Sequence, residues 1–380
     1  MGETLPIRYG KARNEKYGTV REDTPVYGSS GRIDTFDRAL TGGPSLIIGR
    51  KGTVGATYYC FEPCWPIDTV YFTESPADED LRFFKYLLDH LQLARMDRST
   101  AVPGLSRDDY NATDVFIPEL DQQRLIVAEI EKQFSRLDES VANLKRVKAN
   151  LKRYKAAVLK AAVEGKFISS EPSSWTRTNL GTVLTTIEAG KSFKCAERLP
   201  SIREFGVVKV SAVTWGTYNE KESKTCLDPD RIETRYFVKP GDFLFSRANT
   251  IQLVGRCVIA QKVTRKVMLS DKILRFHFSD MVVPQWVLYW LRSDIGRKEI
   301  QRLSTGNQES MRNIGQDRIR QIVFALPSLD EQRAIVAEVE RRLSIIEELE
   351  AVVRANLTRA DRLRQSVLAR AFSGELTTLQ

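Results

Sequence analysis

The chain has 380 residues, of which 42% are hydrophobic and 28% charged, a balance that excludes collagen-like and globally disordered proteins. No stretch approaches the roughly 20 apolar residues of a membrane span, and the first residues lack the apolar core of a signal peptide, so we expect a cytoplasmic protein. The formal charge of +9 suggests a polyanionic partner, and most of the basic excess falls between residues 168 and 325.

Residues 1–116 read as the first globular block. Strand-like runs at 45–49, 56–60 and 68–72 are separated by turn signals, and an amphipathic helical stretch follows at 83–91. This mixture predicts a small domain of the α+β class.

Residues 117–167 read as a long helix that the chain repeats. The segment aligns without a gap to residues 326–376, at a constant offset of 209, and 18 of the 51 positions are identical. Each copy has Pro and Asp near its start and a Gly at its end, where a left-handed cap ends a helix. At about 43 helical residues, each rod would be about 65 Å long.

Apolar residues in the first copy recur every three or four positions, which is typical of a coiled-coil seam. Eight of the ten corresponding positions in the second copy are also apolar, so the two seams can pair with each other. The polar exceptions, Glu350 and Asn356, would either fix the register of the pair or sit at its edge.

A Ser-rich linker at 168–174 leads into the second block, residues 175–325. Strand-like runs recur there, for example at 242–246 and 273–278, and an amphipathic stretch follows at 286–295. The two blocks resemble distant copies, since residues 7–11 parallel 187–191. The predicted order is therefore block, rod, linker, block, rod.

Catalytic and metal-binding motifs are missing from the sequence. It contains neither an Asn/Asp-Pro-Pro-aromatic methyltransferase motif nor a Gly-x-Gly-x-x-Gly fingerprint, so we expect no bound S-adenosylmethionine and no enzymatic activity of its own. The five cysteines are an odd number, and neither His90 nor His277 lies beside a cysteine cluster. We therefore predict neither a disulfide framework nor a metal site.

The blocks instead carry side chains suited to nucleic-acid recognition. Arg50 and Lys51 lie among three glycines, which let a backbone phosphate approach closely. Arg can bind guanine, and Asn or Gln can bind adenine, through two hydrogen bonds in the major groove. The candidate DNA contacts are Tyr27, Ser29, Ser30, Arg50, Lys51, Thr53 and Arg98 in the first block, and Lys191, Arg247, Asn249, Gln252, Asn307, Gln308 and Arg312 in the second. Ordinary solvated turns are the alternative interpretation of these segments.

These features together resemble the specificity subunits of type I restriction–modification enzymes. The resemblance covers nearly the whole chain and rests on residues 25–31, 47–55, 65–69 and 175–181, and on the twin Pro-x-Leu-Asp-x-Gln-Arg helix openings at 118–124 and 327–333. It implies two target-recognition domains, each reading one half of a split site in double-stranded DNA. It further implies that two long helices separate the domains and form an antiparallel coiled coil.

The resemblance also implies partners. Two modification subunits would dock on the helices, where Gln123, Arg124, Gln332 and Arg333 are the candidate docking residues, and would carry S-adenosylmethionine to methylate adenine. Restriction subunits would supply translocation and cleavage with ATP and Mg. One departure is that residues 175 to about 183 have no counterpart in the first block, so that domain either has a shortened edge or starts late. A different class of function, a coiled-coil adaptor whose blocks bind proteins, remains open.

Overall fold

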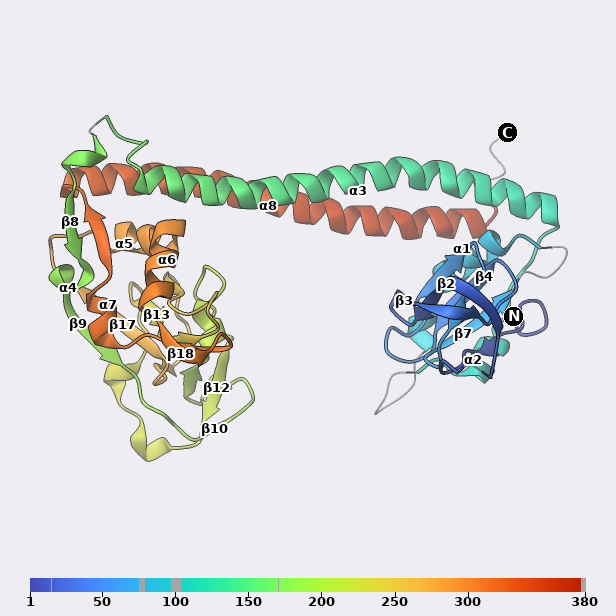
Figure 1. Cartoon of the computed structure of the whole chain (residues 1–380), viewed down its shortest axis with the longest axis horizontal. Coiled ribbons are helices and arrows are strands. Elements are labelled where there is room, and N and C mark those ends of the chain that lie inside the picture. The colour runs from blue at the N-terminus through green and yellow to red at the C-terminus, as the bar shows by residue number, and fades with distance from the viewer. Residues whose placement is uncertain (15, 75–78, 97–103, 170, 377–380) are drawn as a thin grey trace. The chain divides into compact units, whose positions relative to one another are not determined.

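The computed structural model describes residues 1–14, 16–74, 79–96, 104–169 and 171–376. The chain forms two compact units: unit 1 contains residues 1–146 and 353–380, and unit 2 contains residues 147–352. Each unit combines one globular domain with half of each long helix, α3 (Leu120–Val163) and α8 (Leu329–Phe372), which are labelled in Figure 1. The compact units therefore cut across the block-and-rod division expected from the sequence. No helix in the described ranges is both long and apolar enough to cross a bilayer.

The globular part of unit 1, called domain 1, contains two small sheets and short helices. One sheet has the order β1-β7-β4-β5 and the other β3-β2-β6. The strands are β1 (Arg8–Tyr9), β2 (Thr19–Gly28), β3 (Gly31–Ala39), β4 (Ser45–Gly49), β5 (Thr57–Cys60), β6 (Trp65–Pro66) and β7 (Val70–Glu74). The helices are α1 (Leu81–Leu91), η1 (Leu93–Met96) and α2 (Arg107–Asn111).

The core of domain 1 includes the long helices. Ile130 and Phe134 of α3 and Leu368 of α8 are buried in the same apolar cluster as Phe83 and Phe84 of α1. Burying an aromatic or aliphatic side chain of this kind contributes about 1.5–3 kcal/mol. Domain 1 and its helix halves therefore fold as one unit.

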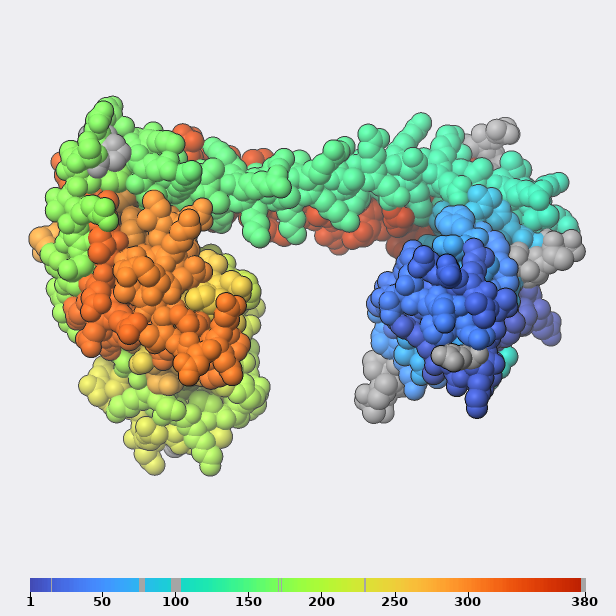
Figure 2. Space-filling view, viewed as in Figure 1, coloured from blue at the N-terminus to red at the C-terminus, as the bar shows by residue number. Residues whose placement is uncertain are grey.

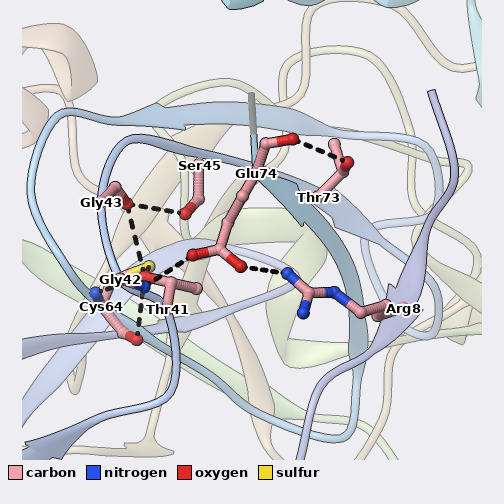
Figure 3. A network of polar contacts seen from close by, with 8 residues as sticks. All are labelled: Arg8, Thr41, Gly42, Gly43, Ser45, Cys64, Thr73 and Glu74. Carbon is pink, nitrogen blue, oxygen red and sulfur yellow. Dashed lines mark hydrogen bonds and ion pairs between the residues drawn. The ribbon is translucent and has the colours of Figure 1, made fainter. Parts of the chain in front are cut away.

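A polar network ties the end of β7 to β1 and to the loop before β4 (Figure 3). The Glu74 carboxylate accepts hydrogen bonds from the Arg8 guanidinium and from the backbone N–H of Gly42, the latter at 2.6 Å. In the same loop the Thr41 hydroxyl accepts a bond from the Cys64 N–H at 2.8 Å, and the Ser45 hydroxyl donates to the Gly43 carbonyl. These bonds hold the entry into β4, the strand that leads to Arg50.

Replacing Glu74 by glutamine should lower the free energy of unfolding of unit 1 by about 1 kcal/mol, because it weakens two charge-assisted bonds at a partly exposed site. Urea denaturation measures this change. Asp37→Asn is the control, since Asp37 is an exposed carboxylate without an ion pair among the described residues. Equal stability of the two variants would contradict a structural role for the Glu74 charge.

The globular part of unit 2, called domain 2, is larger. Its sheets have the orders β10-β12-β11-β16, β15-β13-β17-β9, β14-β19-β18 and β20-β8. The strands are β8 (Thr176–Asn179), β9 (Leu184–Ala189), β10 (Cys195–Ala196), β11 (Gly206–Val208), β12 (Ser223–Cys226), β13 (Phe243–Ser246), β14 (Ala248–Asn249), β15 (Cys257–Ile259), β16 (Val267–Met268), β17 (Ile273–Phe278), β18 (Thr305–Gln308), β19 (Met311–Asn313) and β20 (Val323–Leu326). The helices are η2 (Pro172–Ser174), α4 (Leu180–Val183), η3 (Val210–Val213), η4 (Pro229–Arg231), η5 (Thr234–Tyr236), α5 (Pro284–Arg292), α6 (Asp294–Leu303) and α7 (Gln316–Arg320).

The two long helices pair within each unit. In unit 1, Arg364 of α8 forms an ion pair with Asp138 of α3 and lies 4.3 Å from the centre of the Phe134 ring. In unit 2, Lys155 of α3 lies 3.9 Å from Glu347 of α8. The first half of α3 thus pairs with the second half of α8, and the second half of α3 with the first half of α8. The predicted antiparallel pairing is confirmed.

The helix ends and the polar seam positions also have clear placements. Gly165 and Gly374 follow the two helices with positive φ angles of 68° and 83°, as the expected left-handed caps require. Glu350 is half-buried, whereas Asn356 is exposed. Asn356 therefore lies at the edge of the seam.

The two domains differ at the edge that β8 forms in domain 2. In domain 2 the strand β8 pairs with β20, and the N–H of Leu180 then donates to the Ile322 carbonyl at 2.8 Å. In domain 1 the residue equivalent to Ile322, at the repeat offset of 209, is Thr113. Its carbonyl accepts a bond from the amino group of Met1 at 2.7 Å. Among the described residues of unit 1, no strand corresponds to β8, which agrees with the missing segment noted in the sequence.

Candidate nucleic-acid interface

Both domains place an arginine at the same structural position, directly after a central strand. The N–H of Arg50 donates to the Thr69 carbonyl at 3.0 Å, and its own carbonyl accepts from Leu105 at 2.9 Å. The N–H of Arg247 donates to the Lys272 carbonyl at 3.0 Å, and its carbonyl accepts from Ile314 at 2.9 Å. The sequence comparison of the two blocks is therefore matched by equivalent hydrogen bonds.

The loops that begin with these arginines also close in the same way. The residue before each arginine, Gly49 or Ser246, donates its N–H to a carbonyl across the loop at 2.8 Å. Its own carbonyl accepts a bond from the N–H of a glycine, Gly55 or Gly255, also at 2.8 Å. Gly55 and Gly255 have φ angles of 73° and 72°, which favour glycine. Each domain thus holds a short loop, residues 50–54 or 247–254, on a fixed base.

In domain 1 the predicted contacts at the two turns come together. A Cβ atom on Gly52 would lie 2.9 Å from the Ser29 hydroxyl, so the β2–β3 turn and the loop touch. The Tyr58 hydroxyl donates to the Ser29 carbonyl at 3.2 Å and fixes the turn. Ser30 and Lys51 are exposed beside it, as is Thr53. This cluster offers hydroxyls and one cation to a ligand.

Arg50 itself is half-buried and partly engaged. Its guanidinium lies 5.3 Å from the centre of the Tyr9 ring and 5.9 Å from that of Tyr71, and it donates to the Asp68 carbonyl at 2.7 Å. Arg107 lies 5.9 Å from the same Tyr9 ring. Tyr9 is 48% exposed, so a cation–aromatic surface continues from the loop. Sequence reasoning missed Tyr9 and Arg107; the only signal was the position of Tyr9 inside the repeated segment 7–11.

Two other predicted residues of the first block stand apart. Tyr27 packs against the cluster that contains Cys60, and burial, with a hydrogen bond to that thiol, raises the pKa of the Tyr27 phenol to about 12. Its half-buried side chain therefore supports the turn, and its role as a DNA contact stays a prediction. Arg98 lies outside the described residues.

In domain 2 a three-stranded sheet gathers most of the predicted contacts. Asn249 on β14 is paired with Arg312 on β19, and β18 carries the exposed Asn307 and Gln308. Arg247 reaches the same sheet, where its Nε donates to the Asn313 side chain at 3.4 Å. The hairpin belongs to the orange part of domain 2 that forms much of the visible surface in Figure 2.

Arg312 and Gln252 are both tied to neighbouring parts of domain 2. The Arg312 guanidinium donates to the Ser304 carbonyl at 2.6 Å and to the Gly306 carbonyl at 2.7 Å, so it shapes the β18–β19 hairpin. The Gln252 side chain is exposed, while its carbonyl accepts a bond from Arg297 of α6 at 3.2 Å. Helix α6 thereby holds the loop that presents Gln252.

One cavity lies beside this sheet, and a second cavity shares Lys272 with it. A cavity of about 670 Å³ lies between η3 and the sheet, and its charged lining residues are Lys272 and Arg312. A second one, of about 550 Å³, is lined by four lysines, Lys191, Lys209, Lys224 and Lys272, and by Glu197 and Asp271. Lys191 is paired with Glu233 at 2.6 Å, and this carboxylate raises the pKa of Lys191. Lys209 and Lys224 are paired with Glu197, but the lining still has more cations than carboxylates and so suits an anionic ligand.

The helix openings differ from expectation at their glutamines. Gln123 and Gln332 are 1% and 0% exposed. The Gln123 side-chain oxygen accepts a bond from the N–H of Asp80, the residue that caps α1, at 3.0 Å. The Gln332 side-chain oxygen accepts a bond from the N–H of Val283, which precedes α5, at 2.7 Å. Each glutamine thus joins a long helix to the helix of its own domain. Their predicted role as docking residues is corrected to a structural one.

The neighbouring arginines remain on the surface. Arg124 pairs with Asp121 and Arg333 with Asp330, at 3.4 and 3.2 Å. The two arginine side chains are 61% and 66% exposed. Pairs this exposed contribute little to stability, so they are available for contacts with another protein.

Comparison with known proteins points to one family, although no family model matches the chain. The chain is 26% identical over 307 residues to the type I restriction enzyme EcoKI specificity subunit of Escherichia coli K12, covering 78% of this chain and 64% of that one. It is 25% identical over 360 residues to the EcoBI specificity subunit of Escherichia coli, covering 87% and 73%. To the Escherichia coli EcoEI specificity subunit it is 30% identical over 182 residues, covering 47% and 31%.

The matches to the EcoKI and EcoEI subunits therefore span less than two thirds of those proteins. A solved chain from a study of complex assembly and conformational transition in the type I R-M system is 17% identical, covers 98% of this chain and 96% of its own, and has a TM-score of 0.68. This agreement supports the fold, with two domains and two long helices.

Proposed function

Since this chain is a relative of the type I restriction enzyme specificity subunits, we propose that it is a non-catalytic subunit that recognises a two-part sequence in double-stranded DNA. The observation that carries the proposal is the equivalent placement of Arg50 and Arg247. Each begins a loop on a fixed base, and each loop adjoins hydroxyl or amide side chains that can read base edges. Two such surfaces in one chain suit a site with two half-sites.

We also propose that the chain works in the cytoplasm with modification and restriction subunits. The exposed Asp–Arg pairs at the starts of α3 and α8 are equivalent by the repeat, which supports docking of two modification subunits. S-adenosylmethionine, ATP and Mg would then be held by the partner subunits. On this view the chain supplies specificity, and the chemistry takes place elsewhere.

Electrophoretic shift assays with the modification subunits present test the proposal. We expect binding to a duplex with both half-sites, weaker binding when either half-site is changed, and an affinity that falls steeply with salt because counterions are released from the phosphates. The site itself is found by methylome sequencing of cells with and without the gene. Absence of any DNA affinity in these conditions, with the subunits still assembled, would favour a protein-binding adaptor.

A further inference from the structure

One tryptophan of this chain is on the surface. Trp65, Trp175, Trp286 and Trp290 are at most 7% exposed, whereas Trp215 is 76% exposed. All five lie in the described ranges. Trp215 is thus the tryptophan whose flat, amphipathic ring is open to a ligand.

The backbone around Trp215 is held on both sides. The Thr214 hydroxyl donates to the Val210 carbonyl at 2.8 Å, and the N–H of Asn219 donates to the Ala212 carbonyl at 3.0 Å. After the tryptophan, the carbonyl of Gly216 accepts a bond from Arg292 at 2.7 Å. The indole is therefore presented from a fixed loop, which lowers the entropic cost of binding through it.

Trp215 lines two cavities. One, of about 590 Å³, has charged lining residues of both signs, Lys155, Lys262, Arg292, Glu340 and Glu347. The other is the cavity beside the β14–β19–β18 sheet, whose charged lining residues are Lys272 and Arg312. Met311, 74% exposed, lies in the same lining. Cations, amides and an open aromatic face together suit a nucleotide, which has a negative phosphate and a flat base.

We propose that Trp215 packs against a base of the half-site bound by domain 2, at a step where the base stack opens. Met311 borders this contact on the sheet side, and Lys272 contacts the adjacent phosphate. Proteins that bind DNA use apolar side chains in this way to open a step and gain contact area. The inference rests on the proposed function and adds the residue that senses the deformability of the sequence.

Variants at Trp215 in the complex with the modification subunits test this contact. Trp215→Ala should weaken binding to the full site about tenfold or more, whereas Trp215→Phe should stay within about threefold, because a ring still stacks. Met281→Ala is the matched control, since Met281 is 49% exposed in the same unit and outside the cavities described here. We expect no change in affinity for this control.

A second measurement uses 2-aminopurine placed in turn at each position of that half-site other than the methylated adenine. With the wild-type complex, fluorescence should rise at one position, and Trp215→Ala should abolish the rise. Equal affinity and equal fluorescence for wild type and Trp215→Ala would overturn the inference. The inference would also be overturned if Trp215→Ala impaired subunit assembly but left DNA binding unchanged. If the wild-type complex itself showed no half-site preference, the proposed function would fail instead.

Discussion

Replacing Arg247 by alanine is expected to lower the affinity of the assembled complex for its DNA site by about 10- to 100-fold. The Arg247 guanidinium contacts Asn313 at the edge of the β14–β19–β18 sheet. One bidentate contact to a base favours the correct base over a wrong one by about 1–3 kcal/mol. Recognition should relax at one or two positions of a single half-site, because the loops of domain 1 and domain 2 belong to different compact units. Competition binding with duplexes changed at each position measures this effect.

Two further substitutions serve as controls for Arg247→Ala. Arg50→Ala, at the equivalent position, should relax recognition in the other half-site, with circular dichroism used to check that the ring contacts it loses do not unfold domain 1. Lys272→Gln should weaken binding to all sequences and reduce the salt slope by about 0.9, as expected for one phosphate contact. If Arg247→Ala alone reduced sequence discrimination in both half-sites, the two domains would not recognise DNA independently.

The long helices could be predicted closely because their signals are local. The apolar period, the Pro and Asp openings and the terminal glycines all lie within the segment itself. The structure begins α3 at Leu120 and α8 at Leu329, three residues inside each predicted segment. Pairing was also accessible, since the repeat gave two complementary seams.

The site was less accessible, because its members meet only through the fold. That Asn249 opposes Arg312 depends on the register of β14 and β19, which are more than 60 residues apart, and no local pattern shows it. The burial of Gln123 depends on where α1 ends up. In both cases the sequence indicated a residue suited to polar contacts, but it did not indicate which residue it would contact.

Alanine at Gly10 or Gly190 is expected to be strongly destabilising. A Cβ on Gly10 would lie 2.0 Å from the Ile67 carbonyl oxygen, and one on Gly190 would lie 2.2 Å from that of Leu269. Since both obstacles are backbone, the two chain segments must move apart, at a cost of about 2–4 kcal/mol per substitution. Urea denaturation of the full chain measures this loss, and Gly43→Ala, where no atom lies within 4 Å, should change stability by less than about 0.5 kcal/mol.

A lysine follows each of the two glycines, Lys11 after Gly10 and Lys191 after Gly190. Gly190→Ala should therefore also weaken DNA binding, through the cavity with four lysines that Lys191 lines. If Gly10→Ala and Gly190→Ala were as stable as Gly43→Ala, the backbone contacts at Gly10 and Gly190 would be looser than in the structure. The equivalent backbone placement of Arg50 and Arg247 would then lose its support.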